Sequence, residues 1–542
     1  MDFKQITKCL LAVYLLLPGI PKVNAKQDQR HQVPASTLPG GGMASIKVTA
    51  NQPFKGYKIN NKIAPQVQSD PVINELRKQL RDYKFESTNK VVNKTLPEVL
   101  ESALLNNPIL AESYAEIQGA EWNLIAVRRQ WYPTLNVTKA RLAQSYRINT
   151  RERRARPSRA SNSLNQISEL RASKSDAEIN ITWTFFDPSR SSNINSRSER
   201  LRSLQLLFDV KSRDLVLSVQ QTYLRLQEYL ELINSYENIL TSTERLALLT
   251  EAQFNSGLVS IADVEQIRVQ QYQTLTTLID TYRQLLNDSA RLSELMAMST
   301  GTLVMPSIPL YKYGAWSDPL PVTISQALRL REEVQSSLAE ASSASWAANS
   351  LINSYLPKLA LGGLGSYDNL TTRTSGLPNP ANNTNYFFDG ALGLNFTWQL
   401  FDGGINAANA KVNDFLALGF EKKAANQRLI IVREVEQSYN NYIMSQLSLD
   451  SANAQLLASK RAMIAVEARF IAGVGDMTSV IQSLRQAVTS ATVYSNSIFT
   501  YNNAIDSLYR SSARWPDGAL SPFERRKDML RNQSLLGDSA VQ

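Results

Sequence analysis

Apolar residues recur every three to four positions over most of this 542-residue chain, the spacing that places them on one face of an α-helix. Between Ser189 and Ser256 the chain contains neither proline nor glycine, so the helix predicted over 191–253 should be uninterrupted. A helix of about 60 residues would be about 90 Å long, whereas the mean globular helix has about 11–12 residues. The same spacing predicts helices over 97–131, with a break or kink at Asn107-Pro108, and over 261–298, 321–354, 406–471 and 477–512.

Two stretches instead alternate apolar and polar residues with a period of two, which is typical of strands with one apolar face. The alternating apolar residues are Ile179, Ile181, Trp183 and Phe185 in the first stretch, and Leu392, Leu394, Phe396, Trp398 and Leu400 in the second. Each stretch follows a second strand-like segment, 134–146 or 358–369, across a polar loop. The pattern therefore predicts two β-hairpins, of which the third strand, 358–369, is short and rich in glycine.

The sequence also repeats. The matching positions are Trp122 with Trp346, Pro133 with Pro357, Thr182–Asp187 with Thr397–Asp402, and Glu251–Gly257 with Glu467–Gly473. Two copies of one long unit indicate internal pseudosymmetry, with a first repeat over 96–315 and a second over 316–515. Gly257 and Gly473 each follow a long helix. Because glycine tolerates the left-handed conformation, we expect each to turn the tip of a helical hairpin.

The two ends of the chain differ from the repeats. Residues 1–25 read as a secretory signal, with Lys4 and Lys8 before a short apolar run and small residues at its end. Residues 26–95 form a polar extension, in which a short amphipathic helix is expected from Val72 to Phe85. Residues 516–542 are polar, and we expect a disordered tail.

Composition excludes much catalytic chemistry. The single cysteine, Cys9, lies in the signal, and the single histidine, His31, lies in the polar extension. A metal site or a histidine-based triad is therefore not expected, and no GxSxG, HExxH or GxxxxGK motif occurs. We expect no enzymatic activity and no cofactor.

The formal net charge is +10, and basic residues concentrate over 147–174. This segment includes Arg151, Arg153, Arg154, Arg156 and Arg159. Basic runs can bind nucleic acid, but this one has few aromatic residues and lies between strand-like stretches. We expect an exposed loop, either solvated or in contact with lipid phosphates, and no nucleic-acid partner.

The strands raise the question of what covers their apolar faces. Spanning strands of an outer-membrane barrel have about 9–11 residues and aromatic girdles at the interfaces. Candidate interface aromatics are Trp183, Phe185, Phe186, Trp398 and Phe401. Four strands cannot enclose a usable lumen, but three associated chains would supply twelve. A membrane-free sandwich packed on a helical bundle stays open on these grounds.

The doubled layout resembles the outer-membrane efflux proteins of the TolC type. The resemblance rests on the strand ends at Trp183–Asp187 and Trp398–Asp402, the corners Tyr132-Pro133 and Leu356-Pro357, and the tip Gly257–Val264, within roughly residues 96–515. It implies an α+β membrane protein: a homotrimer whose twelve-stranded outer-membrane β-barrel, with four strands per chain, continues into a long periplasmic α-helical barrel. It further implies docking on an inner-membrane pump through a periplasmic adaptor (membrane fusion) protein, contact with outer-membrane lipid, and export of drugs or secreted proteins.

The resemblance also assigns roles at the tips. Asp263 stands where the family's first tip carries an aspartate, which implies a gating role; a carboxylate that stabilises its own helix start is the alternative. The second tip departs from the family pattern, because Gly475, Ser479 and Gln482 replace charged residues and Asp476 remains. We therefore expect a gate closed by packing of Phe254 and Phe470 rather than by an ionic lock. Adaptor contact, or simple turn geometry, is expected at Gly257, Leu258, Gly473 and Val474.

Two other classes stay open. A structural coiled-coil protein of the envelope would show sustained heptads and no paired hairpins. A periplasmic enzyme or binding protein would be soluble without detergent. The sequence identifies neither the cargo nor the pump.

Overall fold

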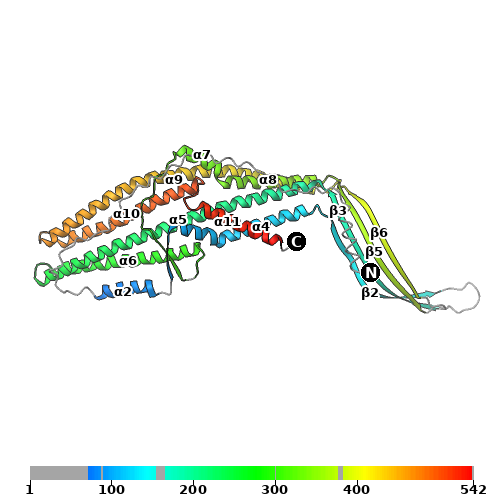
Figure 1. Ribbon diagram of the computed structural model, residues 1–542, viewed down its shortest axis with the longest axis horizontal. Helices are drawn as coiled ribbons and strands as arrows, with labels where there is room; N and C mark the ends of the chain where they lie inside the picture. Colours follow the sequence, from blue (N-terminus) through cyan, green and yellow to red (C-terminus); the bar gives the residue numbers. More distant parts are fainter. Residues whose placement is uncertain (1–70, 87–89, 154–164, 300, 376–381, 540–542) are drawn as a thin grey trace, which may run out of the picture. The chain divides into compact units, whose positions relative to one another are not determined.

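The computed structural model describes residues 71–86, 90–153, 165–299, 301–375 and 382–539, which all belong to one compact unit, Gly56–Gln542. The predicted signal peptide and residues 26–70 of the extension lie outside the described residues. Figure 1 shows the described elements, which follow in the order α2 (Pro71–Glu86), β1 (Lys90–Lys94), α3 (Leu96–Asn106), α4 (Pro108–Arg129), β2 (Thr134–Arg153), β3 (Asn165–Phe186), α5 (Pro188–Asn255), α6 (Ile261–Leu295), β4 (Thr302–Pro306), α7 (Leu320–Leu330), α8 (Glu332–Asn353), β5 (Lys358–Ser375), β6 (Asn382–Thr397), α9 (Ile405–Ile471), α10 (Met477–Ser511) and α11 (Leu520–Ser539).

Four long helices form two antiparallel hairpins, as the sequence predicts. Helix α5 runs uninterrupted over 68 residues and α9 over 67, and α6 and α10 return along them for 35 residues each. Helix α8 packs against both α5 and α9, and α10 packs against α5 and α9 farther along. The shorter helices thus fill the spaces beside the two long ones, and the helices of both repeats form one packed assembly.

The short helices of the two repeats both break, for different reasons. In the first repeat the side chain of Asn107 accepts a hydrogen bond from the N–H of Ile109 at 2.8 Å, and Pro108 opens α4. The predicted break at Asn107-Pro108 is confirmed. In the second repeat the helical pattern predicted over 321–354 is also observed, but Arg331 separates it into α7 and α8, a break that the sequence analysis did not place.

Arg331 has extended backbone (φ −69°, ψ 124°), and its buried guanidinium pairs with Glu333 and Glu434. Glu434 lies on α9, about a hundred residues away in the sequence. The break therefore depends on a tertiary contact, and the local sequence, which lacks a proline here, gives no sign of it.

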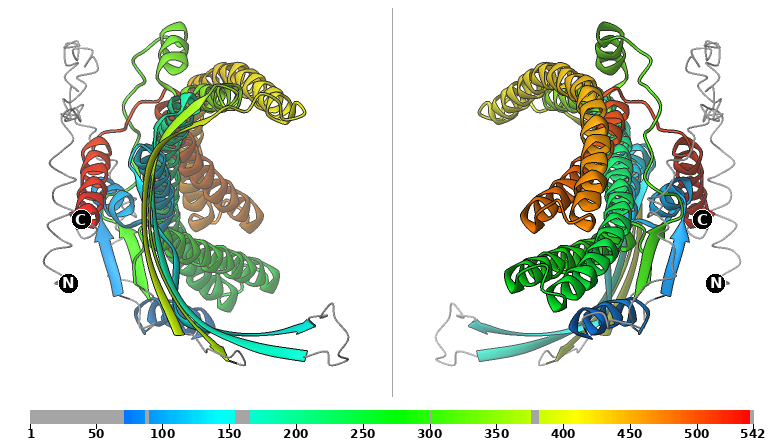
Figure 2. Two further views of the ribbon diagram at one scale, coloured as in Figure 1. Left: turned by 90° about the vertical axis from the view of Figure 1, so that its right-hand side faces the viewer. Right: turned by 90° about the vertical axis from the view of Figure 1, so that its left-hand side faces the viewer.

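The sheet has the order β2-β3-β5-β6, and all neighbouring strands are antiparallel. Figures 1 and 2 show the four strands side by side in one curved layer. The two predicted hairpins are confirmed, and β3 and β5 join them, with Trp183 opposite Leu361. The expectation of a short third strand is wrong, because β5 has 18 residues. Strands β2 and β6 form the two edges of the sheet.

One face of the sheet is apolar over most of its length. On β6 the residues of this face are Tyr386, Phe388, Leu392, Leu394 and Phe396, and all of them are exposed. Leu392 lies opposite Gly363, which lies opposite Ile181, which lies opposite Leu135. Since directly opposed residues share a face, the apolar face crosses all four strands.

Part of the polar N-terminal extension is built into the fold. The expected amphipathic helix is α2, and Ile73 on it is buried. Strand β1 pairs in parallel with β4, the strand that follows the first helical hairpin in the sequence. The hydroxyl of Tyr223 on α5 donates to the carbonyl of Lys94 at 3.0 Å, which holds this pair against the long helix. The sequence analysis missed both strands, since five residues carry little periodicity.

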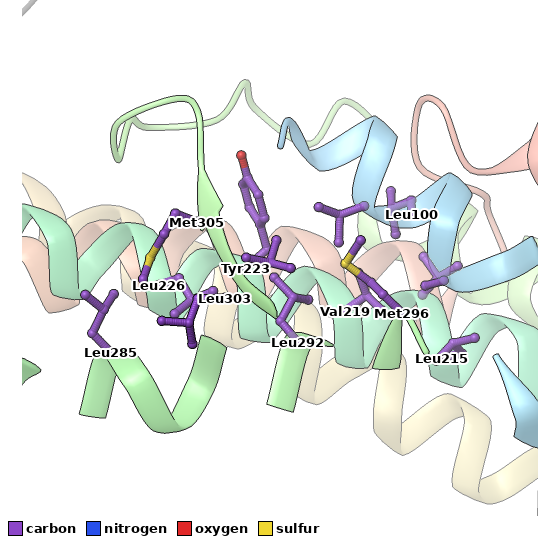
Figure 3. Packing of buried hydrophobic residues seen from close by; sticks show 14 of the residues in the cluster. Leu100, Leu215, Val219, Tyr223, Leu226, Leu285, Leu292, Met296, Leu303 and Met305 are labelled. Carbon is purple, nitrogen blue, oxygen red and sulfur yellow. The ribbon is translucent and has the colours of Figure 1, made fainter. Parts of the chain in front are cut away.

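The largest hydrophobic cluster lies where α3, α5, α6 and the β1–β4 pair meet (Figure 3). Leu226, Leu285 and Leu292 from the long hairpin pack against Leu303 and Met305 of β4. Ser289 and Ser293 of α6 donate to carbonyls of β4 at 2.9 and 2.7 Å, which satisfies the buried edge of that strand.

The expectation of a disordered tail over 516–542 differs from the structure, in which α11 is helical. The ring of Phe523 stacks on that of Trp515 at a centroid distance of 4.4 Å and also contacts Phe208 of α5. Lys527 pairs with Asp209 at 2.7 Å. One buried aromatic residue thus anchors a helix whose composition is otherwise polar.

In the described part of the chain, no helix is both long enough and apolar enough to cross a membrane.

Candidate functional site

The tip of the first helical hairpin is a left-handed glycine turn followed by a capping box. Gly257 has φ +74°; its N–H donates to the carbonyl of Phe254 at 2.8 Å, and the N–H of Leu258 donates to Gln253 at 2.9 Å. Ser260 and Asp263 then cap α6 reciprocally, because the Ser260 N–H donates to the Asp263 carboxylate at 3.0 Å and the Asp263 N–H donates to the Ser260 hydroxyl at 3.3 Å.

The second tip repeats this geometry with different residues. Gly473 also has φ +74°, and its N–H donates to the carbonyl of Phe470 at 2.9 Å. Asp476 caps α10 alone, by accepting from the backbone N–H of Ser479 at 2.6 Å and from its hydroxyl at 3.0 Å. Both hydrogen bonds lower the pKa of Asp476, and the bond from the backbone N–H has the larger effect. A Cβ at Gly475 would come within 3.0 Å of the Phe470 nitrogen, so a side chain there would displace backbone.

Both acidic residues predicted at the tips are therefore held within their own hairpins. The carboxylates of Asp263 and Asp476 satisfy orphan N–H groups at the first turn of α6 and α10. The helix-start role expected for Asp263 is observed, Asp476 has the same role at α10, and a role of either residue in a gate stays a prediction.

The two aromatic residues predicted to close a gate differ in environment. Phe254 is 38% exposed, whereas Phe470 is 3% exposed inside the second hairpin. Leu258 and Val474, the residues after the two glycines, are 75% and 68% exposed. Among the residues predicted to act at the tips, Phe254, Leu258 and Val474 are thus accessible in the single chain. Phe470 is instead packed inside its own hairpin.

At the opposite end of the long helices, two tryptophans hold the corners between helix and strand. The indole N–H of Trp183 donates to the carbonyl of Trp131 at 2.8 Å, and that of Trp398 donates to the carbonyl of Tyr355 at 2.9 Å. Both acceptors lie just after the short helices α4 and α8. The internal repeat therefore extends to the hydrogen bonds of the corners.

The neighbouring aromatic residues are also accessible. Phe186 and Phe401 are exposed, and Phe185 packs on Trp183 at a centroid distance of 6.0 Å. Trp398 and Phe401 follow the last residue of β6, so the observed strand ends earlier than the alternation in the sequence predicts.

Aspartates that follow the corners start the long helices. Burial alone would raise the pKa of Asp187, but hydrogen bonds from Ser189 and Lys358 outweigh burial and lower it. Asp402 accepts from the N–H of Asn406 at 2.9 Å and from the hydroxyl of Tyr355 at 2.7 Å, contacts that lower its pKa.

The basic segment is not the continuous loop predicted over 147–174. Arg147, Arg151 and Arg153 are residues of β2, and Arg171 and Lys174 are residues of β3. Arg154, Arg156 and Arg159 lie outside the described residues. Glu169 of β3 pairs with both Arg147 of β2 and Arg171 of its own strand, so one carboxylate offsets part of the charge of these two arginines.

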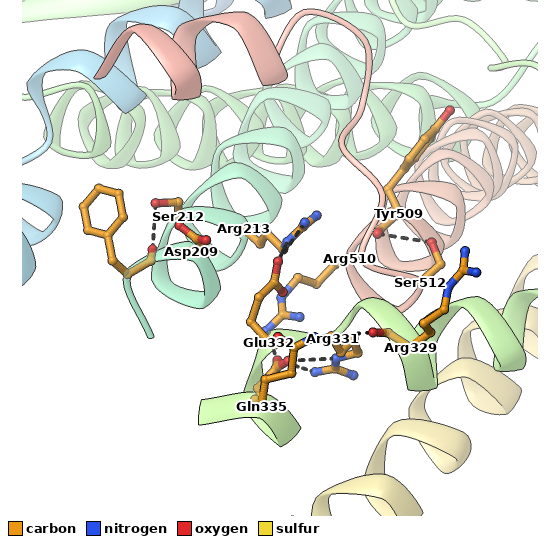
Figure 4. A network of polar contacts seen from close by, with 12 residues as sticks. Asp209, Ser212, Arg213, Arg329, Arg331, Glu332, Gln335, Tyr509, Arg510 and Ser512 are labelled. Carbon is orange, nitrogen blue, oxygen red and sulfur yellow. Dashed lines mark hydrogen bonds and ion pairs between the residues drawn. The ribbon is translucent and has the colours of Figure 1, made fainter. Parts of the chain in front are cut away.

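A partly buried ionic network joins the two repeats near the middle of the long helices (Figure 4). Arg213 of α5 pairs with Glu332 at 3.0 Å, and Arg510 of α10 pairs with Glu333 at 2.8 Å. Burial alone would raise the pKa of Glu333, but Arg331 and Arg510 outweigh it and lower the pKa to about 2. The sequence analysis missed this network, because charged residues on a helix normally indicate a solvated face.

A second buried polar group lies beside this network. Asp506 on α10 is 2% exposed, and the Gln220 side-chain amide donates to one of its oxygens at 2.7 Å. The other oxygen has no hydrogen-bond partner among the described residues. The described residues contain no cluster of three or more His, Cys, Asp or Glu side chains placed to hold a metal ion.

Similarity to known proteins agrees with this architecture. The sequence matches the family model described as Outer membrane efflux protein over residues 99–298 and 323–508, one range in each repeat. It is 21% identical over 413 residues to the outer membrane protein TolC of Salmonella enteritidis, covering 75% of this chain and 79% of that one. It is also 21% identical over 442 residues to TolC of Escherichia coli (strain K12), covering 79% and 83%. The fold resembles the Campylobacter jejuni CmeC outer membrane channel, with a TM-score of 0.63 and 16% identity over 86% of this chain and 94% of that one.

Proposed function

Because the chain belongs to the outer membrane efflux protein family, we propose that three copies of it form one export channel through the outer membrane. The chain is an outer-membrane protein with a periplasmic helical tunnel, and it is not an enzyme. Beyond family membership, we propose the trimer, the twelve-stranded barrel, the gate and the partners.

The two long edge strands carry the proposal of a closed barrel. Strand β2 has 20 residues and β6 has 16, and among the described residues each has a neighbouring strand on one side only. Long unpaired edges invite further pairing. Because the sheet has an even number of antiparallel strands, β6 of one copy can meet β2 of the next in antiparallel orientation. Three copies then close a barrel of twelve strands, within the range of outer-membrane barrels.

Helix α9 supports the same assembly. Its exposed apolar residues include Leu457, Ile464 and Ile471, each seven positions from the next. A seven-residue apolar repeat is the pattern by which helices pack along each other. In one copy this stripe has no cover, so we assign it to the contact with α5 or α6 of the neighbouring copy.

The assembly is tested by the replacement Ile464→Asp, with Lys422→Asp on the same helix as the control. Native mass spectrometry of the detergent-extracted protein should give a trimer for the wild type and the control, and a monomer for Ile464→Asp. Planar bilayers should show channels only where trimers form. A wild-type protein that is monomeric and needs no detergent would refute the channel.

The tips are the proposed periplasmic aperture. Asp263 engages its own capping box, which supports a gate closed by packing around Phe254 and Leu258 rather than by ionic contacts between hairpins. Ser260→Ala breaks the same cap but keeps the charge, so it is the matched control for Asp263→Ala. We expect both to change conductance alike and modestly. A large rise for Asp263→Ala alone would indicate an ionic lock.

The partners follow from the same family membership. We assign the exposed tip residues Leu258 and Val474 to contact with a periplasmic adaptor, which joins the channel to an inner-membrane pump. The cargo is either a drug or a secreted protein. Crosslinking from these two positions and identification of the captured inner-membrane protein test the assignment, and a capture unchanged by Leu258→Asp would contradict it.

A further inference from the structure

The part of the sheet farthest from the helices carries a row of arginines on its apolar face. Arg147 of β2 lies directly opposite Arg171 of β3, and Arg171 lies directly opposite Arg373 of β5. The next position in the row, on β6, is Asn382. Three adjacent strands thus present a guanidinium at one level.

The register fixes the face on which this row lies. Between Arg171 and Ile181 the pairing of β3 with β5 has no irregularity, and the two residues are an even number of positions apart. They therefore lie on the same face. Ile181 belongs to the apolar face that crosses all four strands, so the arginines continue that face rather than the polar one.

Charge on this row is not balanced, whereas charge on the opposite face is. Glu169 is the acidic partner of both Arg147 and Arg171, whose side chains are 59% and 61% exposed. Arg373 is exposed as well. On the opposite face, in contrast, Arg141 and Lys174 have their own partners: Arg141 pairs with Asp176 at 2.5 Å and Lys174 with Asp368 at 2.9 Å. Like charges side by side on neighbouring strands destabilise a sheet, so we expect a further anion to bind at this row.

The distance of the arginine row from the apolar band indicates which anion binds there. From Phe396 to Tyr386 the apolar face of β6 covers about 33 Å along the strand, or about 23 Å along the membrane normal at a tilt of ~45°. This matches the apolar band of about 25 Å in outer-membrane barrels. Asn382, at the level of the arginines, lies about 13 Å farther along the strand and about 9 Å farther along the normal, at the depth of the lipid headgroups.

We propose that Arg147, Arg171 and Arg373 form a binding site for the phosphate groups of lipid headgroups in the outer leaflet. The site rests on the proposed membrane-spanning role of the sheet. The helices begin at the other end of the strands, so this end faces the cell exterior. Planar guanidinium groups form paired hydrogen bonds with phosphate oxygens, and three of them in a row suit a headgroup that carries two phosphates. Register positions 151 and 153 on β2 continue the same face beyond the row.

The test uses the full-length protein in detergent and native mass spectrometry with diphosphoryl lipid A as the probe. The double variant Arg171→Gln/Arg373→Gln should raise the apparent Kd for this lipid about thirtyfold, since each basic residue near a membrane surface contributes about fivefold in affinity. The control Arg141→Gln/Lys174→Gln removes two positive charges from the opposite face of the same sheet and should leave the Kd within about twofold. The variant Arg171→Lys/Arg373→Lys, which keeps the charge but loses the planar fork, should bind with intermediate affinity.

Two further arms identify the ligand. Lipid A without phosphates should bind the wild type as weakly as the double variant does, and inorganic phosphate should not compete, because the lipid chain is needed for binding. Equal lipid affinity in wild type and double variant would overturn the proposal, and so would competition by free phosphate. If the protein conducts in bilayers while the double variant binds lipid A normally, only this inference fails; if it forms no channel, the proposed function fails first.

Discussion

Replacing Asp506 by asparagine should stabilise the protein, and the gain should grow with pH. The carboxylate is buried on α10 and accepts one hydrogen bond, from Gln220. Burial raises its pKa to about 8. The charged and titratable groups that line the same small cavity are Arg213 on α5, Tyr509 and Arg510 on α10, and Arg514 just after α10.

The magnitude follows from the difference between the folded and unfolded pKa values. Below pH ~4 the carboxyl is protonated in both states, so it carries no penalty. Between the ordinary value of 3.8 and the folded value of about 8, the unfolded chain releases the proton and the folded chain keeps it. Stability then falls by about 1.4 kcal/mol for each pH unit and is constant above that window, a total of about 6 kcal/mol. Asparagine keeps the acceptor for Gln220 and never ionises.

The assay is urea unfolding in detergent at pH 5, 7 and 9, followed by tryptophan fluorescence. The difference between Asp506→Asn and wild type should increase from pH 5 to pH 7 and again to pH 9. Asp280→Asn, the same change on an exposed part of α6, should show no such trend. The reasoning is refuted if Asp506→Asn is less stable than wild type at every pH, because that result means the carboxylate is ionised and paired with Arg213 or Arg510.

Three smaller perturbations test the corners and the tips. Trp398→Phe removes the hydrogen bond to the carbonyl of Tyr355 and should lower the free energy of unfolding by about 1 kcal/mol, seen as a lower urea midpoint; an unchanged midpoint would mean that water replaces the indole. Gly473→Ala places a side chain at φ +74° and should destabilise by about 1 kcal/mol, whereas Gly419→Ala, in open space on helix α9, should stabilise by a similar amount; the same sign for both would contradict the left-handed turn. Asp476→Ala should lower the thermal midpoint at pH 7, and the loss should shrink as the pH is lowered below the ordinary range of a carboxyl group, because a carboxylate with a lowered folded pKa stabilises above its unfolded pKa and loses that effect as the pH falls through the folded one; an equal loss at every pH would mean that the capping charge is irrelevant.

Helices and tips could be predicted from the sequence because their signals are local. The absence of proline and glycine between Ser189 and Ser256 predicts α5 almost to its ends, and a glycine after each long helix marks each tip. A helical hydrogen bond joins residues four positions apart, so the pattern of a short window is sufficient. The same applies to Asp263, whose capping role depends on Ser260 three residues before it.

Pairing between distant segments could not be predicted in this way. The parallel pair of β1 and β4 joins residues about two hundred positions apart, and Phe523 holds α11 through contact with an aromatic residue of α5. Neither segment has a pattern that names its partner. The break at Arg331 has the same origin, since its cause, Glu434, belongs to another helix.

The candidate sites divide along the same line. The sequence by itself determined the duplicated order of helices and strands, the glycine turns and the lack of catalytic groups, because each depends on residue type and near neighbours. Only the tertiary structure decided that Arg147 and Arg171 of the basic segment form a row with Arg373 on one face of a sheet, since a face depends on register, and register is a property of strands brought together by folding. It also decided that Asp506 is buried and that Glu333 is mostly shielded from solvent, because burial depends on what packs over a helix and not on the helix alone.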